Sequence, residues 1–394
     1  MRILFIGIDK MAKEIKYIGF YDILRDGRQY RVYSLAAAKK MDYICQEINS
    51  MGYKVRIISP SHVIAKGNKK IVKQSCSIDK DCLLELPPSC EAKNKFQRVV
   101  RVLQARVWLF IYLLKNTERN EKVLVYHNYN LSLPVVLAQK IKKFDIVLEI
   151  EEIYSKVWKL SLLQKWKEKR LLKYANNNCL VVSEVLAEEL GISEPAISYG
   201  SYTICDKPHI KVKDSIIRLV LTGSVDKERG NGFLAVEAMR YLPKDYKLFL
   251  SGSVAAKDRD EFIKLIKSVN EELGREACVY LGLLDDDAYE NLLLRSDIAL
   301  NPQKDGEFGK YVFPSKILTY LSHGLPVVST RGESIVKSKL SDVITFSDGY
   351  DGKSIAEAIR RVQIQSSKYY LDSLEMLQND FSIKVKRIFE KDEH

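Results

Sequence analysis

A series of short apolar runs, rich in Val, Ile and Leu, limits what this chain can fold into more than any other feature. In the first half the runs stand at Arg2–Ile8, Lys54–Ser59, Val123–His127, Asp145–Ile150 and Cys179–Ser183. The stretches between them are long enough for helices. Strands that alternate with helices are typical of a parallel, doubly wound sheet.

A second series of the same kind follows in the second half of the chain. Its runs are Ile216–Thr222, Tyr246–Ser251, Cys278–Leu283, Asp297–Asn301, Pro326–Ser329 and Asp342–Phe346. Helical patterns such as Lys257–Glu272 lie between these runs. The sequence therefore predicts an α/β protein with two Rossmann-like, doubly wound domains that face a cleft.

The best candidate for a linker between the two halves is Ile197–Asp214, which has no clear hydrophobic period and contains Gly200 and Pro208. We place the boundary near residue 210. The predicted ranges are an N-terminal domain at 1–205, a linker at 206–215, a C-terminal domain at 216–375 and a C-terminal helix at 376–394. That helix could cross back to the first domain.

Composition excludes several classes of protein. Hydrophobic residues make up 46% and charged residues 29% of the 394, so long disorder and fibrous repeats are not expected. No apolar run approaches the roughly 20 residues that span a bilayer, and the N-terminus makes a poor signal peptide. The seven cysteines are scattered, which argues against a disulfide framework or a zinc site and favours the reducing cytoplasm.

Net charge indicates the kind of partner. Sixty-three basic residues against 51 acidic ones give +12, which favours anionic partners such as nucleotides or phospholipid headgroups. No nucleic-acid-binding motif accompanies this charge, so we expect no nucleic acid partner. The segment Lys156–Lys173 fits a basic amphipathic helix at an anionic membrane surface, and it equally fits a domain helix that buries Trp and Leu. The expected location is the cytoplasm, with a place at the inner face of the membrane left open.

One candidate phosphate site follows the first strand of the second half. The strand runs into Gly223, and Gly230 stands just before a helix that begins near Asn231. Such a turn aims backbone N–H groups at an anion, and Arg229 could place a guanidinium on phosphate oxygens. An ordinary strand–turn–helix corner with surface charges is the alternative.

A second candidate lies in residues 301–330. A polar loop leads to Phe313-Pro314, where Pro suits the first turn of a helix predicted over Ser315–His323. Ser315 and Lys316 would then stand at the carboxyl edge of the sheet, where open α/β sheets bind ligands. Phosphate is the expected ligand there.

In the first half, polar residues follow two neighbouring strands. His127 comes directly after one predicted strand, and Glu149, Glu151 and Glu152 end the next. These groups could contact a sugar, or two of the acids could flank the helix that begins near Ser155. The run Asp285-Asp286-Asp287 is better explained by a helix N-cap with an acidic first turn than by a metal site.

Together these residues resemble the retaining, nucleotide-sugar-dependent glycosyltransferases of the GT-B fold, in particular glycosyltransferase family 4 of the surface-polysaccharide type. Gly223, Ser224, Arg229 and Gly230 occupy the places of that family's Gly-Arg-x4-Lys-Gly motif. Counting back from Gly324, the family's glutamate signature falls on Tyr311, Val312, Phe313, Pro314 and Thr319. Glu307, upstream, could replace the first signature glutamate through a longer loop.

The resemblance implies a hexosyltransferase that moves a sugar from a nucleotide-diphosphate donor, with UDP favoured, to a glycan or a lipid-linked acceptor with retention. It implies no metal and no other cofactor. The predicted catalytic residues are Arg229, Lys316, Glu152, Glu151 and His127. The predicted donor-binding residues are Gly223, Ser224, Gly230, Glu307, Tyr311, Phe313, Pro314, Ser315 and Thr319.

Two other functions stay open at this point. The three glutamates keep a nucleotide-sugar epimerase possible, because an epimerase needs acid/base carboxylates and a donor but no acceptor. Ser224 and Thr319 stand where the family holds its donor. They would suit a non-catalytic, GT-B-like partner in a glycan-assembly complex.

Overall fold

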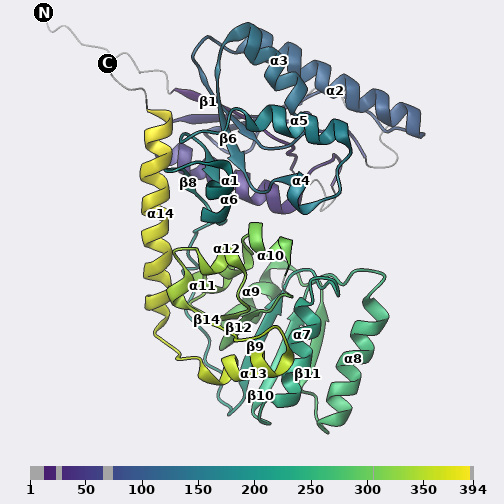
Figure 1. Cartoon of the computed structure of the whole chain (residues 1–394), viewed down its shortest axis with the longest axis vertical. Helices are drawn as coiled ribbons and strands as arrows, with labels where there is room; N and C mark the ends of the chain where they lie inside the picture. Colours follow the sequence, from purple (N-terminus) through teal and green to yellow (C-terminus); the bar gives the residue numbers. More distant parts are fainter. Residues whose placement is uncertain (1–12, 24–28, 65–73, 305, 391–394) are drawn as a thin grey trace, which may run out of the picture. The chain divides into compact units, whose positions relative to one another are not determined.

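The computed structural model describes residues 13–23, 29–64, 74–304 and 306–390 (Figure 1). These divide into two compact units: unit 1 runs to Leu180 and adds 192–196 and the chain from Ser382, and unit 2 holds 181–191 and Ile197–Phe381. Unit membership does not decide where an independently folding domain begins, so the boundary near residue 210 stays a prediction. The predicted strand Arg2–Ile8 lies outside the described residues.

The first sheet has eight strands among the described residues, in the order β3-β4-β2-β1-β5-β6-β7-β8. Its central pairs are parallel, and β3 and β4 pair antiparallel at one edge. The strands are β1 (Glu14–Ile18), β2 (Lys54–Ile58), β3 (Gln74–Ser77), β4 (Cys82–Leu86), β5 (Lys122–Tyr126), β6 (Asp145–Ile150), β7 (Leu180–Val181) and β8 (Ala196–Ile197). Successive parallel strands are added outward from β1 to β2 and β4 on one side, and from β5 to β6 on the other. The strand order therefore reverses between β1 and β5, as in a Rossmann sheet.

Five helices in the described part of unit 1 connect these strands: α1 (Leu35–Ser50), α2 (Lys95–Asn116), α3 (Ser132–Lys142), α4 (Tyr154–Val157) and α5 (Leu162–Leu172). Their starts follow local chemistry. The side chain of Ser34 accepts a hydrogen bond from the N–H of Ala37, and that of Asn94 accepts one from Gln97 at 2.9 Å, so α1 and α2 begin where an N-cap residue stands.

The prediction of one continuous helix over Lys156–Lys173 is wrong. The chain leaves α4 after Val157 and starts α5 at Leu162. Ser161 and Gln164 form a capping box between them, because each side chain accepts a hydrogen bond from the other's backbone N–H. A strong N-cap thus divides a segment whose spacing of Trp and Leu fits one helix.

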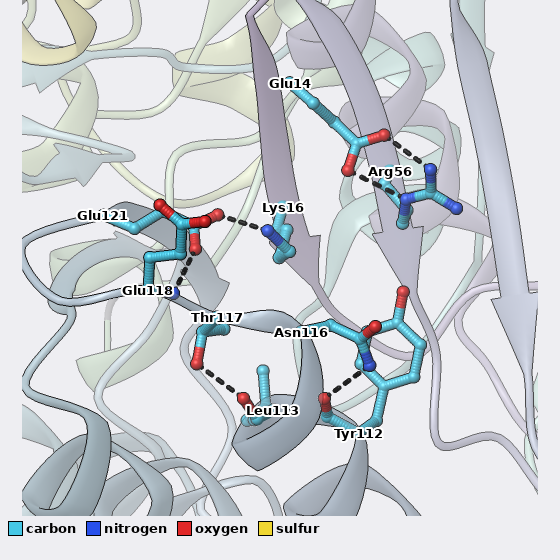
Figure 2. A network of polar contacts seen from close by, with 9 residues as sticks. All are labelled: Glu14, Lys16, Arg56, Tyr112, Leu113, Asn116, Thr117, Glu118 and Glu121. Carbon is cyan, nitrogen blue, oxygen red and sulfur yellow. Dashed lines mark hydrogen bonds and ion pairs between the residues drawn. The ribbon is translucent and has the colours of Figure 1, made fainter.

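Charged side chains join β1, β2 and the chain that follows α2 (Figure 2). Arg56 on β2 donates to both carboxylate oxygens of Glu14 on β1, at 2.7 and 2.9 Å, and Lys16 pairs with Glu121. Lys16 and Arg56 are register partners in the parallel pair, so these charges stand on one face of the sheet. The contacts are partly buried and fix β1 at the centre of the sheet.

The second sheet, in unit 2, contains six strands within the described ranges, in the order β11-β10-β9-β12-β13-β14. Its pairs are parallel. The strands are β9 (Ile217–Thr222), β10 (Tyr246–Ser251), β11 (Cys278–Gly282), β12 (Ile298–Asn301), β13 (Val327–Ser329) and β14 (Ile344–Phe346). All six predicted strands of the second half are confirmed to within two residues at each end, and the two parallel sheets confirm the predicted fold class.

The helices of unit 2 are α6 (Glu184–Leu190), α7 (Asn231–Ala238), α8 (Arg259–Glu272), α9 (Asp286–Leu294), α10 (Glu307–Tyr311), α11 (Lys316–Ser322), α12 (Glu333–Val336), α13 (Gly352–Arg361) and most of α14 (Ser367–Phe389). Asp285 caps α9 by accepting from the N–H of Ala288 at 2.8 Å, with Asp286 and Asp287 in the first turn. The aspartate run is therefore a helix start. No helix in the described part of the chain is long and apolar enough to cross a membrane.

The carboxyl edge of the second sheet is shaped by close contact between two loops. Gly252, after β10, has a φ of +140°, and a Cβ there would lie 1.9 Å from the carbonyl oxygen of Gly223. Gly223 itself has a φ of +98°. No side chain fits between these backbones, so glycine at 252 lets the β9 and β10 loops pack directly.

We predict that Gly252→Ala destabilises unit 2 far more than a left-handed backbone alone would. Gly274→Ala is the matched control, because Gly274 has a φ of +61° with nothing within 4 Å of an added Cβ. The control should cost about 1–2 kcal/mol, while Gly252→Ala adds a backbone clash. Urea unfolding followed by circular dichroism measures both, and equal midpoints for the two variants would contradict the contact.

Candidate functional site

The loop after β9 is the first part of the candidate site in unit 2. The N–H of Gly223 donates to the carbonyl of Ser251 at 2.9 Å, and that of Val225 donates to Ser253 at 2.8 Å. Between them Ser224 is exposed, with its Oγ 3.4 Å from the Oγ of Ser253. The loop therefore has a fixed backbone and presents a small hydroxyl pair at the carboxyl edge of the sheet.

Lys316 stands beside this loop. It is the first residue of α11, and its Nζ lies 3.8 Å from the position that a Cβ on Gly223 would take. Burial, and to a smaller extent the nearby positive charge of Arg229, lowers the pKa of Lys316 to about 8. The structure thus brings Lys316 to Gly223 and Arg229, which lie more than 80 residues before it in the sequence.

Arg229 and Gly230 are held by the loop after β12. The carbonyl of Arg229 accepts a hydrogen bond from the N–H of Lys304 at 2.8 Å. Gly230 has a φ of +79°, and the side chain of Lys304 fills the space of a Cβ there, with its Cγ 2.7 Å from that point. The aliphatic part of the Lys304 side chain therefore packs directly against the backbone of Gly230, which is the N-cap residue of α7.

The remaining predicted donor-binding residues lie around α10 and α11. Tyr311 and Phe313 are buried, and the ring of Phe313 stacks on Tyr199 at 4.5 Å between centroids. Pro314 is also buried, and Ser315 is exposed at the start of α11. Tyr311, Phe313 and Pro314 thus brace the segment that carries Lys316.

Glu307 and Thr319 complete the predicted set. Glu307 begins α10, and its side chain lies outside the described residues. Thr319 is half-buried on α11, and its carbonyl accepts from Nδ1 of His323 at 2.7 Å. Thr319 therefore stays one helical turn from Lys316.

Three residues that the sequence analysis did not single out form hydrogen bonds where β9 meets the Gly223 loop. The N–H of Thr222 donates to the hydroxyl of Tyr320 at 2.8 Å, and the Thr222 hydroxyl lies 3.2 Å from that of Tyr289. Tyr320 is buried four residues after Lys316, on the same helix. Helical spacing from Lys316 is the signal that could have indicated Tyr320.

A cavity of about 590 Å³ opens beside the loops that follow β12 and β13. Its basic lining residues are Lys304, Lys310, Arg331 and Lys337. Lys337 is paired with Glu188 at 2.6 Å and with Glu333 at 3.2 Å. Glu333 also lines the cavity, so its charged lining is mixed.

In unit 1, His127 follows β5 and is buried, with 1% of its surface exposed. Its Nδ1 lies 3.1 Å from the carbonyl oxygen of Glu152, and its Nε2 has no hydrogen-bond partner among the described residues. Burial lowers the pKa of His127 to about 4. The imidazole is neutral at pH 7, and the Nδ1 proton donates to that carbonyl.

Three glutamates stand at the end of β6. Glu149 is buried and accepts a hydrogen bond from the hydroxyl of Tyr17. Burial, followed by the charge of Glu151, raises the pKa of Glu149. Glu151 forms an ion pair with Lys40 of α1, and a carboxylate oxygen of Glu152 accepts from Nε1 of Trp158 at 3.1 Å.

The alternative is that two of these acids cap or flank the next helix, and Glu151 and Glu152 do stand shortly before α4. At the start of α4 the N–H of Ser155 donates to the carboxylate of Glu168 on α5, at 3.0 Å. The residue before α4, Ile153, makes no side-chain cap. A glutamate 13 residues downstream therefore supports this helix start.

A group of potential metal ligands lies in unit 2 apart from Lys316. One ligand atom each from Cys205, Glu290 and His323 lies within 4.8 Å of the others. Glu290 is already paired with Lys207, and the N–H of Cys205 donates to the carbonyl of Ser322 at 3.1 Å. The expectation that the reaction needs no metal stays a prediction.

Comparison with solved structures identifies the architecture. The E. coli trehalose-6-phosphate structure bound with UDP-2-fluoro glucose aligns with a TM-score of 0.62 over 96% of this chain and 97% of that one, at 12% identity. The lipopolysaccharide outer core galactosyltransferase WaaB aligns at 0.59 over 95% and 99%, at 13% identity. A trehalose-6-phosphate synthase studied for glycosyl transfer with retention aligns at 0.59 over 96% and 97%, at 10% identity.

The chain has the GT-B fold. No protein-family model matches it, and no curated protein sequence matches it. At 10–13% identity these alignments concern the path of the backbone. The functional argument therefore depends on this chain's own residues.

We predict that the Lys316 amine titrates near pH 8 and that Arg229 contributes to the shift. Competitive labelling with acetic anhydride, read by mass spectrometry across pH, gives the midpoint. Arg229→Gln removes a repelling charge and should raise the midpoint. Arg240→Gln, whose arginine pairs with Glu272 elsewhere in unit 2, is the control and should leave it unchanged. The same midpoint in wild type and Arg229→Gln would show that the two cations are not neighbours.

Proposed function

We propose that this protein is a retaining hexosyltransferase that uses a nucleotide-diphosphate sugar and transfers the sugar to a glycan or lipid-linked acceptor. The observation that carries the proposal is the pair of cations, Lys316 and Arg229, beside the Gly223 loop at the carboxyl edge of a Rossmann sheet. Two like charges held close together in a partly buried place repel each other. A bound anion would relieve that repulsion.

The chemistry of the leaving group fits this arrangement. When the bond from the sugar to the diphosphate breaks, negative charge grows on the phosphate oxygens. Cations already positioned there stabilise that charge without reorganisation during the step. Lys316 supplies a compact ammonium and Arg229 a planar guanidinium that can bind two oxygens. Ser224 and Ser253 could donate hydrogen bonds to the same group.

The solved structures support the class of donor. Proteins of this fold have been solved with UDP-2-fluoro glucose and studied for transfer with retention. We propose a UDP-sugar donor and retention of configuration for this chain. Its Phe313-Pro314-Ser315-Lys316 segment supports a place in family 4, with the surface-polysaccharide type.

In unit 1 we assign the sugar-facing roles to the groups that follow β5 and β6. A neutral His127 can hold a hydroxyl without adding a charge, and the carbonyl of Glu152 sets its tautomer. Glu151 and Glu152 would contact sugar hydroxyls. Their present partners, Lys40 and Trp158, orient both carboxylates.

Nucleotide binding is the direct test. Calorimetry with UDP, GDP, ADP and CMP, each with and without EDTA, should give saturable binding to one base that EDTA leaves unchanged. Turnover of the corresponding sugar conjugate then follows. The absence of binding to any nucleotide would defeat the proposal and favour a non-catalytic partner in glycan assembly.

We predict that Lys316→Met and Arg229→Gln each lower turnover at least tenfold, which corresponds to about 1.4 kcal/mol or more of lost charge stabilisation. Arg240→Gln makes the same change in net charge away from the loop and should behave as wild type. Circular dichroism confirms that each variant is folded. Wild-type rates in both site variants would remove the phosphate site.

Nucleotide affinity should also fall as pH rises. The protonated Lys316 binds the anion, and with a pKa of about 8 its protonated fraction declines between pH 7 and 9. A UDP that is fully ionised over this range should therefore bind roughly tenfold more weakly at pH 9. Lys316→Met should remove this dependence on pH. If the affinity of the wild type for UDP does not change across the range, Lys316 does not contact the nucleotide.

We also propose that the segment 156–173 contacts an anionic membrane surface, which would place the enzyme at the inner face of the membrane in the cytoplasm. The supporting observation is that Leu162 is 87% exposed, Leu163 60% and Trp166 48%, among several lysines. Apolar side chains between basic ones suit the interface of an anionic bilayer.

The membrane contact predicts a loss of vesicle binding. The triple variant in which Leu162, Leu163 and Trp166 are each changed to Ser should sediment with phosphatidylglycerol vesicles at least fivefold less than the wild type. UDP affinity should be unchanged. A control with Ile263→Ser, whose side chain is 42% exposed in unit 2, should bind vesicles as wild type does. If the triple variant binds vesicles as well as the wild type, the segment is an ordinary domain helix with no role at the membrane.

A further inference from the structure

A second cavity, of about 520 Å³, lies wholly within unit 1. Four aromatic side chains form much of its wall: Phe20, Tyr33, Tyr126 and Tyr154. They come from the ends of β1 and β5, from the start of α4 and from the segment before α1. The cavity thus opens at the carboxyl edge of the first sheet, where the strand order reverses.

The charged residues that line this cavity in the described part of unit 1 are all of one sign. Arg98 and Arg106 reach it from α2, and His62 reaches it from the segment that follows β2. Among the described residues that line it there is no Asp or Glu. Within the described ranges, neither Arg98 nor Arg106 forms an ion pair.

Arg106 is the more buried of the two arginines. Burial lowers the pKa of its guanidinium, and one terminal nitrogen donates to Oδ1 of Asn130 at 2.5 Å. The amide of Asn130 is neutral, so it orients the guanidinium without compensating its charge. A partly desolvated cation in this situation gains most from an anionic ligand.

His62 provides an independent observation. Its side chain is 9% exposed, and its Nε2 is buried without a hydrogen-bond partner among the described residues. Burial, and then the charge of Arg98, lowers the pKa of this imidazole, so the ring is neutral at pH 7. His62 lines the cavity, so a buried polar atom without a partner among the described residues belongs to its wall. Such atoms are rare in folded proteins.

We propose that this cavity binds a phosphate group of the acceptor, with Arg98 and Arg106 on the phosphate oxygens and the aromatic wall against the apolar part of the same molecule. This inference rests on the proposed function, because only a glycosyltransferase has an acceptor. It names the chemical class of that acceptor, which the proposed function leaves open. A sugar phosphate and a lipid-linked phosphate both supply this chemistry.

The experiment is calorimetry on the full chain with probes that separate charge from shape. Octyl phosphate and octyl glucoside share an apolar chain, and only the first carries the anion. Glucose 6-phosphate and glucose form the corresponding soluble pair. The variants are Arg98→Gln and Arg106→Gln. Arg101→Gln is the control on the same helix, because Arg101 faces Gln104 at 2.7 Å and does not line this cavity.

We expect wild type and Arg101→Gln to bind a phosphate probe at least tenfold more tightly than its neutral counterpart, and both cavity variants to lose at least tenfold in that affinity. Arg98 is exposed, so Arg98→Gln keeps the test valid if Arg106→Gln fails to fold. Tighter binding of octyl phosphate than of glucose 6-phosphate identifies a lipid-type acceptor, and the reverse identifies a sugar phosphate.

Two results would overturn the inference: equal binding of the phosphate and neutral probes, or undiminished phosphate binding in both cavity variants. UDP affinity is measured on the same samples and should not change in Arg98→Gln, because the proposed donor site lies in unit 2. If the wild type binds the phosphate probes but not UDP, the proposed function is wrong, and the cavity is still a phosphate site.

Discussion

The reversal of strand order at the centre of each parallel sheet is the constraint on which the rest of the structure depends. Strands on either side of the reversal send their following loops in opposite directions, which leaves a crevice at the carboxyl edge. In the second sheet the reversal falls between β9 and β12, and in the first between β1 and β5. Both candidate sites lie at these two places. The chemistry therefore follows from topology before any individual side chain is considered.

The two sites place their charges by different means. In unit 2, backbone contact between Gly223 and Gly252 packs two loops tightly and leaves room beside them for Lys316. In unit 1, side chains on long elements converge, with Arg98 and Arg106 two turns apart on α2. Each site holds at least one partly buried cation, Lys316 in unit 2 and Arg106 in unit 1. That is costly without a ligand, and it is the common physical basis for assigning anions to both.

Much of the fold could be predicted because its signals are local. Apolar runs gave the six strands of the second sheet, and a residue such as Asp285 sets a helix start through bonds to its own neighbours. The segment 156–173 shows the limit of such reasoning. Its apolar spacing indicated one helix, while the capping box of Ser161 and Gln164 starts a new one. Two local signals competed there, and the hydrogen bonds of the cap decided the outcome.

By itself the sequence determined the α/β class, the two sheets and the positions of Lys316, Arg229 and His127 in the segments that follow strands, because these depend on periodicity and on where parallel strands must finish. Only the tertiary structure decided which of these groups meet. The approach of Lys316 to Arg229 and the burial that lowers the pKa of Lys316 arise from contacts between residues far apart in the chain. Such contacts leave no trace in local spacing. The cavity lined by Arg98 and His62 was decided in the same way, since it is built from six separate segments of unit 1.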